Sequence, residues 1–476
     1  MSTTILKPTW WGNRAHVVYT IVVFIVLASL DNSALALLLA MSGSIEEAFG
    51  VSAAAVGFIV AAQVFVTAVT AVGWGYIGDS RSRKPLLLWG TAIWAAAEIL
   101  SSFADTYWLL LFWQIVAAFG LGSIASVGFS VISDFIGPKR RGLAMSFWGL
   151  AQGIGGLIGL LVASQLGASD PGLPFVVVGV LGFLFAFLYL FTFDPPRGYK
   201  EPELQALYEE GGEYEHRIDR SQIPILLRRR TNLWLILQGI TAQVAYGALT
   251  WSTRLYQEKV LAEGYSMETA TKAGGILASI FIVGGVLSII GGMIGDAAQR
   301  RSLRGRALVS TIGIMGAIPF FLIFFWVPLR GIELTDGAGT VTLFGEVLVA
   351  MVTNPWVAIA FLSSLLALGF TSADSPNWFA LITDVNLPEH RGTVFGLGNL
   401  ANGGGRSFGT WASSSLASGM SRALPPPVNW AASLTLSMVF FLPTGFCYWK
   451  ASQSSPGDIT DVRSVMTERA ATPAAR

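Results

Sequence analysis

The feature that most constrains this sequence is a series of apolar segments, each about as long as the hydrocarbon layer of a membrane is thick. About 20 apolar residues cross that layer as a helix. Twelve such segments follow one another, near residues 17–40, 54–77, 85–103, 107–134, 142–166, 173–193, 232–256, 271–295, 306–328, 354–383, 392–419 and 428–449. The sequence therefore predicts an all-α membrane protein with twelve transmembrane helices.

The composition agrees with a surface that faces lipid. Charged residues make up 12% of the chain and apolar residues 53%, whereas soluble domains carry about 25% charged residues. The first apolar segment follows Lys7 and Arg14 as a signal peptide would, but it is longer than a signal and is interrupted by Asp31 and Asn32. We therefore expect it to be retained as a helix.

The basic residues indicate the orientation. If the N-terminus is cytoplasmic, 24 of the 30 Lys and Arg residues fall in the tails or in loops on the cytoplasmic side. Such an excess is typical of cytoplasmic loops. We expect a multi-pass protein of the cell membrane with both termini in the cytoplasm.

Polar stretches divide the chain into four parts. Residues 194–230 contain an acidic run and end in three arginines, and we expect a cytoplasmic linker that lies partly as an amphipathic helix on the membrane. The linker separates a six-helix bundle at 1–193 from another at 231–449, and a polar cytoplasmic tail, expected to be mobile, follows at 450–476. The weakly apolar loop 329–353 is predicted to be an interfacial element and not a thirteenth span.

Two internal repeats relate the halves. The segment ISDFIGPKRRG at 132–142 recurs as ITDVNLPEHRG at 382–392, and glycines beyond it continue to match at the same offset of 250 residues. A second pair is GYIGDSRSRK at 75–84 and GMIGDAAQRR at 292–301. Parallel repeats form the two halves of some transporters that work by rocking. The sequence therefore predicts two pseudo-symmetric bundles.

The segment 75–84 resembles the loop signature of the major facilitator superfamily, G-x-x-x-D-x-x-G-R-[RK], with Ser82 in place of the second glycine. The resemblance implies that Asp79 lies at a helix end and meets Arg141 or a neighbouring helix terminus at a cytoplasmic gate. A carboxylate at a helix N-terminus forms a lock that breaks when two bundles separate. The alternative is that the basic residues only fix the topology. The predicted gate residues are Gly75, Asp79, Arg83, Asp134, Arg141, Asp296, Arg300, Asp384 and Arg391.

Within that superfamily the N-terminal half is similar to the Spinster branch, whose members are proposed to move lysophospholipids and sphingoid phosphates. The similarity rests on Asp31, on the Gly-Leu-Gly motif at 120–122, on the helix end at 133–142 and on the glycine-rich run at 149–156. It implies a lipid-like substrate.

The chain also departs from the Spinster pattern. Spinster proteins have Asp-Arg in helix 1, where this chain has Asp31-Asn32, and their helix-4 arginine and glutamate correspond to Val116 and Ser123. The charged cluster is thereby reduced to one carboxylate. Burial favours the neutral form of a carboxyl group, so Asp31 is a candidate proton site. The alternative is a structural aspartate that forms hydrogen bonds beside Asn32.

Polar residues at helical spacing mark three spans of the second half, and one face of a helix carries residues spaced three, four and seven apart. The superfamily resemblance implies that helices 1, 4, 7 and 10 line a central cavity. The predicted substrate and coupling cavity consists of Asp31, Asn32, Ser123, Gln243, Tyr246, Arg254, Asp374, Asn377, Trp378, Asn399, Asn402 and Arg406.

We expect this cavity to match a zwitterion. Arg406 would bind a phosphate or carboxylate group, and Asp374 or Asp31 would balance an amine. The alternative is an Asp374–Arg406 ion pair that holds two helices together.

Other charged positions near the outer side have weaker interpretations. Glu98 is expected to reach the membrane interface and has no assigned role. Arg254 and Glu258 are four residues apart and form either a gate pair or a solvated helical pair.

Together these features predict a secondary active transporter that moves an amphipathic, lysophospholipid-like solute by alternating access, with protons as a candidate coupling ion. The alternatives are efflux of drugs or small organic anions and, in another class, a ligand receptor with a transporter fold and no flux. No enzyme is expected, because nucleophile-elbow, metalloprotease and phosphate-loop motifs are absent. Cys447 is the only cysteine, so no thiol metal cluster is expected. We expect no cofactor, metal or nucleic acid, and a monomer whose partners are substrate and membrane lipids.

Overall fold

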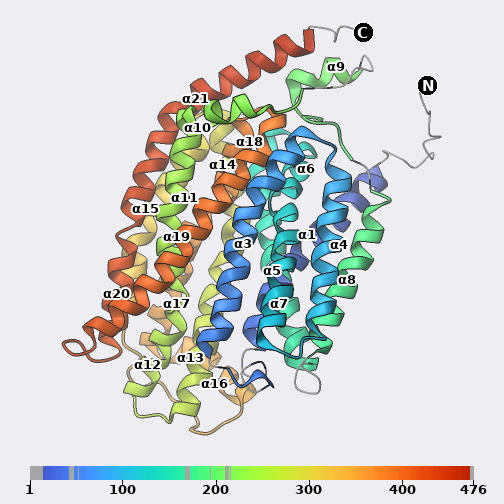
Figure 1. Ribbon diagram of the computed structural model, residues 1–476. Coiled ribbons are helices and arrows are strands. Elements are labelled where there is room, and N and C mark those ends of the chain that lie inside the picture. Colours follow the sequence, from blue (N-terminus) through green and yellow to red (C-terminus); the bar gives the residue numbers. More distant parts are fainter. Residues whose placement is uncertain are drawn as a thin grey trace.

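The computed structural model describes residues 14–41, 45, 48–51, 53–166, 172–192, 194–209, 214 and 216–471. These residues form helices and no strand. Long helices run roughly side by side through the molecule, and the described starts and ends of the chain lie at the same end of it (Figure 1). We call this end the linker side, because the described linker residues 194–209, 214 and 216–229 lie there, and the opposite end the distal side.

The described residues of the N-terminal half form six helical rods. Their elements are α1 (Arg14–Ala40), α3 (Ala53–Ser80), α4 (Arg83–Ser101), α5 (Tyr107–Ser123), η1 (Ile124–Gly128), α6 (Phe129–Asp134), α7 (Arg141–Leu166) and α8 (Leu173–Tyr189). The elements α5, η1 and α6 form one rod, in which η1 is a π-helical turn. Turns of this kind inside an α-helix are frequent at functional sites.

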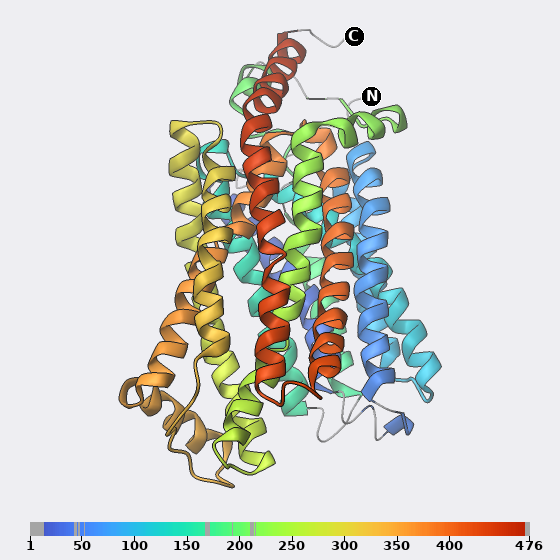
Figure 2. The ribbon, with the colours of Figure 1, turned by 90° about the vertical axis from the view of Figure 1, so that its left-hand side faces the viewer.

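The C-terminal half repeats this arrangement. Its elements are α11 (Arg230–Leu249), α12 (Ser252–Ala262), α13 (Met267–Phe281), η5 (Ile282–Leu287), α14 (Ser288–Arg301), α15 (Gly305–Trp326), α16 (Thr340–Thr353), α17 (Pro355–Thr371), α18 (Asp374–Asp384), η6 (Pro388–His390), α19 (Arg391–Met420), α20 (Val428–Met438) and α21 (Phe441–Ala471). Adjoining elements again combine into six rods, and α16 is an additional short helix on the distal side (Figure 2).

Apolar length and composition allow seven of the described helical stretches to cross a membrane on their own. Three more are apolar but shorter, among them α8 and α16. Large apolar side chains such as Phe65 and Trp89 are more than 60% exposed on the outside of the rods, as lipid contact requires. The expectation of an all-α membrane protein is therefore confirmed.

Glycines allow equivalent helices to touch in both halves. A Cβ atom on Gly155 or Gly159 of α7 would collide with the backbone of Ser29 or Ser33 in α1. At the matching repeat positions, Gly405 and Gly409 of α19 lie equally close to the backbone of α11. Small residues permit such close helix contact in membranes. The contact repeats at the offset of 250 residues that relates the two sequences.

The predicted mobile tail is wrong for residues 450–471, which continue α21 as a helix. We call this segment the tail helix. Its Val462 and Met466 are buried against Leu204, Leu387 and Tyr214 of the linker and the α18–α19 connection. The tail helix is ordered because every third or fourth residue is apolar and finds a linker surface to cover it.

Polar contacts extend this docking. The Arg469 guanidinium donates hydrogen bonds to Glu389 and to the Tyr214 hydroxyl, both at 2.5 Å. Arg463 lies 3.4 Å from the Glu203 carboxylate. In Figure 1 the tail helix runs out from the bundle toward α9 (Gln205–Glu209).

The segment 329–353 contains α16, which is 14 residues long. Leu343 and Val347 are buried, whereas Val341 and Val352 are each 87% exposed. A helix this short does not span the hydrocarbon layer, in line with the prediction that the loop adds no thirteenth span.

We expect Met466→Asp to detach the tail helix. The substitution places a carboxylate among buried apolar side chains, a change that costs about 2–5 kcal/mol. Limited proteolysis of the protein in nanodiscs should cut within 456–471 faster than in the wild type. Thr467→Asp adds the same charge at the adjacent exposed position and serves as the control. Equal cleavage of both variants would contradict the docking.

Candidate gate and transport cavity

Two carboxylates cap helix N-termini across the boundary between the halves. Asp79, at the end of α3, accepts hydrogen bonds from the backbone N–H groups of Gly392 and Thr393 in α19, at 3.2 and 2.6 Å. Asp296 of α14 accepts from Gly142 and Leu143 of α7, at 2.8 and 3.0 Å. A negative charge at a helix N-terminus is favourable. Each half therefore holds the first turn of a helix in the other half.

Close backbone contact accompanies these caps. A Cβ atom on Gly75 would lie 2.5 Å from the carbonyl oxygen of Gly392, and one on Gly292 would lie 2.5 Å from that of Gly142. Neither position has room for a side chain. The glycines of the repeated signature thus let α3 meet α19 and α14 meet α7.

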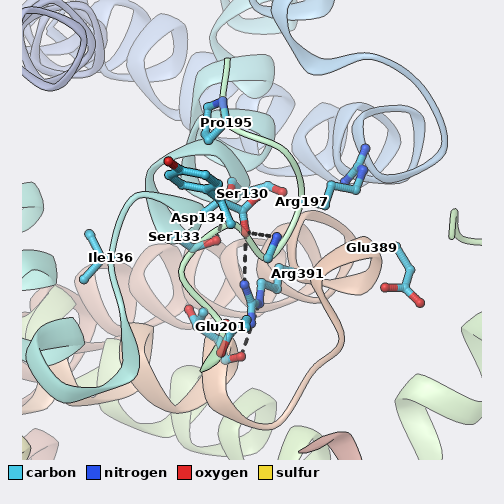
Figure 3. Close-up of polar contacts among 12 residues, drawn as sticks. Ser130, Ser133, Asp134, Ile136, Pro195, Arg197, Glu201, Glu389 and Arg391 are labelled. Carbon is cyan, nitrogen blue, oxygen red and sulfur yellow. Dashed lines mark hydrogen bonds and ion pairs between the residues drawn. The ribbon is translucent and has the colours of Figure 1, made fainter. Parts of the chain in front are cut away.

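Two arginines cross the same boundary in opposite directions. Arg391 lies 3.1 Å from Asp134 of the N-terminal half, and Arg141 pairs with Asp384 of the C-terminal half. Both guanidinium groups also donate to Glu201 of the linker, which lies 2.6 Å from Arg141. Figure 3 shows Glu201, Arg391 and Asp134 in one buried chain of contacts. Glu201 thus joins the two halves through one carboxylate.

Each of these aspartates has a second arginine from its own half. Arg83 pairs with Asp134, and Arg306 pairs with Asp384 and lies 2.7 Å from Asp296. The repeat alignment assigns this second role to Arg300, but Arg300 is exposed and donates to the backbone carbonyl of Lys139. The connection from α14 to α15 is longer than that from α3 to α4, so the arginine at the start of α15 reaches the gate instead.

The linker supplies gate residues that the sequence did not reveal. Arg197 donates to the backbone carbonyls of Gly78 and Arg81 and lies 3.7 Å from Asp79. Burial and the neighbouring Arg83 lower the pKa of Arg197 to about 10. For Glu201, burial raises the pKa, but Arg141 and Arg391 outweigh burial and hold the pKa below its usual value. Glu201 is therefore ionised at neutral pH.

Aromatic rings close the boundary next to these charges. Phe129 of α6 stacks on Phe395 of α19 with 3.8 Å between ring centroids, and Phe379 and Trp378 of α18 pack against Phe395. The charged contacts described above and the aromatic layer together close the linker side. We call the two the linker-side gate.

Beyond the aromatic layer lies a cavity of about 900 Å³ between the halves. Eight residues predicted for the cavity line it, namely Asn32, Gln243, Tyr246, Asp374, Trp378, Asn399, Asn402 and Arg406. Most of the other lining residues are small or apolar, such as Val64, Ala68 and Val286. The π-helical turn contributes Ala125, whose carbonyl oxygen accepts a hydrogen bond from Asn399 at 3.0 Å.

Three predicted cavity residues lie elsewhere. Ser123 is buried between α5 and α4 beside Gly90. Asn377 is buried and donates to the carbonyls of Ala373 and Gly291. Arg254 pairs with Glu258 at 2.6 Å on the distal side; the Arg254 side chain is 41% exposed and the Glu258 side chain 11%. Their helical spacing was right for a polar face, but that face turns toward a neighbouring helix or toward solvent.

Asp31 and Glu98 are carboxylates within predicted apolar spans of the N-terminal half. The side chain of Asp31 lies outside the described residues, although α1 contains its backbone. Glu98 was expected at the membrane interface, but it is fully buried and accepts a hydrogen bond from Gln114 at 3.4 Å. Gln114 is held in turn by Gln63, so a buried polar group of α3, α4 and α5 keeps Glu98 inside.

Asp374 and Arg406 both line the cavity, but among the described residues they form no ion pair. Asp374 accepts hydrogen bonds from the hydroxyls of Tyr448 and Tyr246, the latter at 3.1 Å, and from the Gln238 amide at 3.3 Å. The Arg406 guanidinium has no carboxylate partner among the described residues. The alternative of an Asp374–Arg406 pair is therefore wrong for this conformation.

The halves meet along two pairs of helices, α3 with α19 and α7 with α14, and we call each line of contact a seam. The two seams differ in length. Near the gate, Ser146 of α7 donates to the Ser288 carbonyl of α14 at 2.9 Å. Farther along, a Cβ on Gly403 would touch Ala68 at 3.2 Å, whereas one on Gly153, the equivalent position by the repeat, would meet no described atom within 4 Å. The α3–α19 seam thus stays closed beyond the level at which the α7–α14 seam parts.

Comparison with known proteins agrees with this two-halved arrangement. The sequence profile of the Major Facilitator Superfamily matches residues 21–410. The chain belongs to the major facilitator superfamily. Members of this superfamily are transporters and not enzymes, so the sequence-based exclusion of an enzyme is confirmed.

Among superfamily members, Spinster proteins are similar to this chain. The zebrafish sphingosine-1-phosphate transporter SPNS2 is 26% identical over 361 residues, which cover 69% of this chain and 66% of the relative. The zebrafish protein spinster homolog 3 is 26% identical over 264 residues, 52% of this chain and 51% of the relative. The matches therefore span between half and two thirds of these relatives. The predicted resemblance to the Spinster branch is confirmed.

Solved structures share the fold. The proton:xylose symporter XylE bound to 6-bromo-6-deoxy-D-glucose superposes with a TM-score of 0.64 at 15% identity, covering 92% of this chain and 96% of that protein. A bacterial homolog of the human lysosomal transporter Spinster, in an inward-facing and unoccupied conformation, gives 0.55 at 18% identity, covering 94% and 99%. The multi-pass membrane fold is thereby established.

We expect Arg306→Ala to open the linker-side gate and Arg300→Ala to leave it closed. Removal of one partner from a buried ion pair costs about 3–5 kcal/mol, and about 1.4 kcal/mol changes an equilibrium tenfold. In a Cys447→Ser background, maleimide labelling of a cysteine introduced at buried Thr393 should be at least about tenfold faster with Arg306→Ala. Similar rates for both variants would show that Arg306 is not part of the gate.

We also expect the tail helix to undock as pH falls from about 6.5 to about 4.5. Burial, opposed by Glu389 and assisted by Arg469 and Arg229, lowers the pKa of His390 from 6.5 to about 4. Undocking removes Arg469, one of the groups that lower this pKa, so the undocked state takes up the proton first and docking loses stability as pH falls through this window. Glu389, whose pKa is held low, remains ionised there.

The measurement is the distance between spin labels at exposed Gln205 and Thr467 in the same cysteine-free background. Short distances should dominate at pH 7.5 and longer ones should increase toward pH 4.5. His390→Gln, which keeps a side chain able to bond to Gln222, should remove most of this pH dependence. An unchanged pH response in that variant would assign the effect to other groups.

Proposed function

We propose that this chain is a secondary active transporter that moves an anionic amphipathic solute, of the lysophospholipid or sphingoid phosphate type, by alternating access. The observation that carries the proposal is the Arg406 guanidinium, which lines a largely apolar cavity and has no carboxylate partner among the residues that the structure describes. A charged group at bilayer depth costs several kcal/mol unless it is paired or hydrated. A bound anion would supply the missing partner.

The cavity chemistry fits both ends of such a solute. The planar guanidinium group binds phosphate oxygens through two parallel hydrogen bonds, and Asn402 and Gln243 line the same space with amide groups. The apolar part of the wall, which includes Val64 and Val286, would accept an acyl or sphingoid chain.

The parted α7–α14 seam supports entry from the membrane. Ile154 and Val286 line the cavity and are about half exposed. An acyl chain that lies between them would remain in an apolar environment. A water-soluble solute would need no such opening, so this observation favours a lipid-like substrate over a small organic anion.

The gate contacts support alternating access. Both helix caps and both crossing arginines lie on the linker side, whereas the cavity lies beyond them. If the halves rock apart, these contacts break together and the cavity opens to the linker side. Because basic residues concentrate on the linker side, we take that side to be cytoplasmic. We further propose that the protein works as a monomer in the cell membrane.

Two other functions deserve a direct comparison. Efflux of small organic anions uses the same guanidinium, and the structure of the human organic anion transporter MFSD10 superposes with a TM-score of 0.60 at 15% identity, covering 91% of this chain and 99% of that protein. A receptor with a transporter fold would bind the same ligands without moving them. Flux measurements separate all three.

The test is uptake into proteoliposomes of radiolabelled lysophosphatidylglycerol, sphingosine phosphate and p-aminohippurate. We expect uptake of at least one lipid and none of the small anion. Arg406→Gln should reduce lipid uptake at least about tenfold, because hydrogen bonds to charged groups contribute about 1.5–3 kcal/mol. Arg422→Gln, at an exposed distal position, should have no effect. Binding of lipid without uptake would favour the receptor, and uptake of p-aminohippurate alone would favour small-anion efflux.

A further inference from the structure

The short helix α10 (Ile223–Arg228) lies crosswise to the rods at their linker-side end, next to the start of α11 (Figures 1 and 2). Its Leu226 is buried, whereas Ile225 is 62% exposed and Leu227 is also exposed. Leu226 holds one face of α10 against the protein, so the opposite face carries the two exposed apolar side chains and exposed Arg228. An apolar face beside a cation is typical of helices that lie in the membrane interface.

A second apolar surface begins where α10 ends. Arg230 is exposed and is the first residue of α11. It is followed on the same side of that helix by Leu233, Leu237 and Ile240, which are all exposed. Exposed apolar residues along a membrane-length helix face the acyl chains of lipids. Arg230 therefore lies at the linker-side edge of this stripe, where the lipid headgroups begin.

The helix α21 brings another cation to the same level. The rings of Trp234 in α11 and Phe446 in α21 lie 6.1 Å apart, measured between centroids. Arg230 and Lys450 each lie four residues from this contact toward the linker side, which is about 6 Å along either helix. Lys450 Nζ lies 5.0 Å from the ring centroid of exposed Trp449. Tryptophan is enriched at the membrane–water interface, in agreement with this depth.

We call Arg228, Arg230 and Lys450 the corner cations. Two carboxylates of the tail helix face the same corner, but both have other partners. Asp461 pairs with Arg229 at 2.5 Å, and Asp458 accepts a hydrogen bond from the backbone N–H of Thr231 at 3.1 Å. Within the part of the chain that the structure describes, the corner cations form no ion pair with a carboxylate. Their charges are therefore available to an anion from outside the protein.

We propose that the corner cations bind the phosphate group of an anionic membrane phospholipid, whose acyl chains lie along the exposed stripe of α11 and the adjoining face of α21. Arginine guanidinium groups bind phosphate oxygens through paired hydrogen bonds. Each Lys or Arg side chain near the membrane surface also adds to the attraction for anionic lipids. The site lies on the outer, lipid-facing surface and does not depend on which solute the cavity carries.

The apolar surroundings favour a lipid over a soluble phosphate compound. A soluble anion would contact the corner cations and leave Ile225, Leu227 and the α11 stripe uncovered. A phospholipid covers both surfaces, because its phosphate group and its acyl chains lie one below the other in the order in which the cations and the apolar stripe follow each other along α11. The apolar part of the site continues the lipid-exposed surface of the rods, so a membrane lipid reaches it by lateral diffusion.

The experiment measures which phospholipid lies beside the stripe. In the Cys447→Ser background, a fluorophore on a cysteine introduced at Leu237 is quenched by lipids that carry bromine on their acyl chains. Phosphatidylcholine nanodiscs receive the same small fraction of brominated phosphatidylglycerol or brominated phosphatidylcholine, at constant ionic strength. We expect phosphatidylglycerol to be enriched at least about fivefold beside the label, because one cation near an anionic lipid already contributes about that factor.

Two triple variants assign the preference. Arg228→Gln/Arg230→Gln/Lys450→Gln should make quenching by the two lipids equal. Arg140→Gln/Arg301→Gln/Arg304→Gln removes the same charge from exposed linker-side positions elsewhere and should keep the wild-type preference. Lys450→Gln alone should lower the enrichment by about fivefold, which tests the site even if the first triple variant does not fold.

Three results would overturn the inference. Equal quenching by both lipids in the wild type would exclude a preference for the anionic lipid. An equal loss in both triple variants would attribute the preference to the overall charge of the linker side. Loss of the preference when inorganic phosphate replaces sodium chloride at the same ionic strength would assign the corner cations to a soluble anion. The proposed transport function stands or falls separately, by the flux measurements.

Discussion

The arrangement of the two halves depends on carboxylates that cap helix N-termini across the boundary between them. Asp79 holds the first turn of α19 and Asp296 holds that of α7. Both caps are buried, so water cannot replace the contacts while the halves stay together. The helix ends, the crossing arginines and Glu201 therefore form one cooperative lock. Because all of these contacts lie at one end of the bundles, they close that end and leave the cavity to be reached from elsewhere.

Charge is distributed unevenly between the gate and the cavity. At the gate, Arg141, Arg391 and Asp134 have partners from both halves and from the linker. In the described part of the cavity, Arg406 has no carboxylate partner and Asp374 accepts hydrogen bonds from neutral donors. Paired charges stabilise one conformation, whereas an unpaired charge in an apolar environment favours a ligand. The same residue types thus serve two purposes because their surroundings differ.

The linker and the tail helix add a layer that the repeated bundles lack. Glu201 and Arg197 enter the gate from the linker, and Val462 and Met466 of the tail helix cover the same linker. Neither segment has a counterpart within the repeat. The pseudo-symmetric contacts on the linker side are therefore stabilised by a unique, asymmetric element on one side of the protein.

The sequence by itself determined the helical membrane fold, the two repeated halves and most of the residues that meet across the halves on the linker side, because apolar length, the 250-residue offset and the repeated Asp and Gly positions are local patterns. It also placed Arg406 and Asp374 in the cavity. Only the tertiary structure decided that Arg306 replaces Arg300, that Glu201 joins both halves, that Arg254 lies away from the cavity and that Glu98 is buried instead of reaching the membrane interface. Helical spacing defines a polar face, but loop lengths and helix packing determine what that face meets.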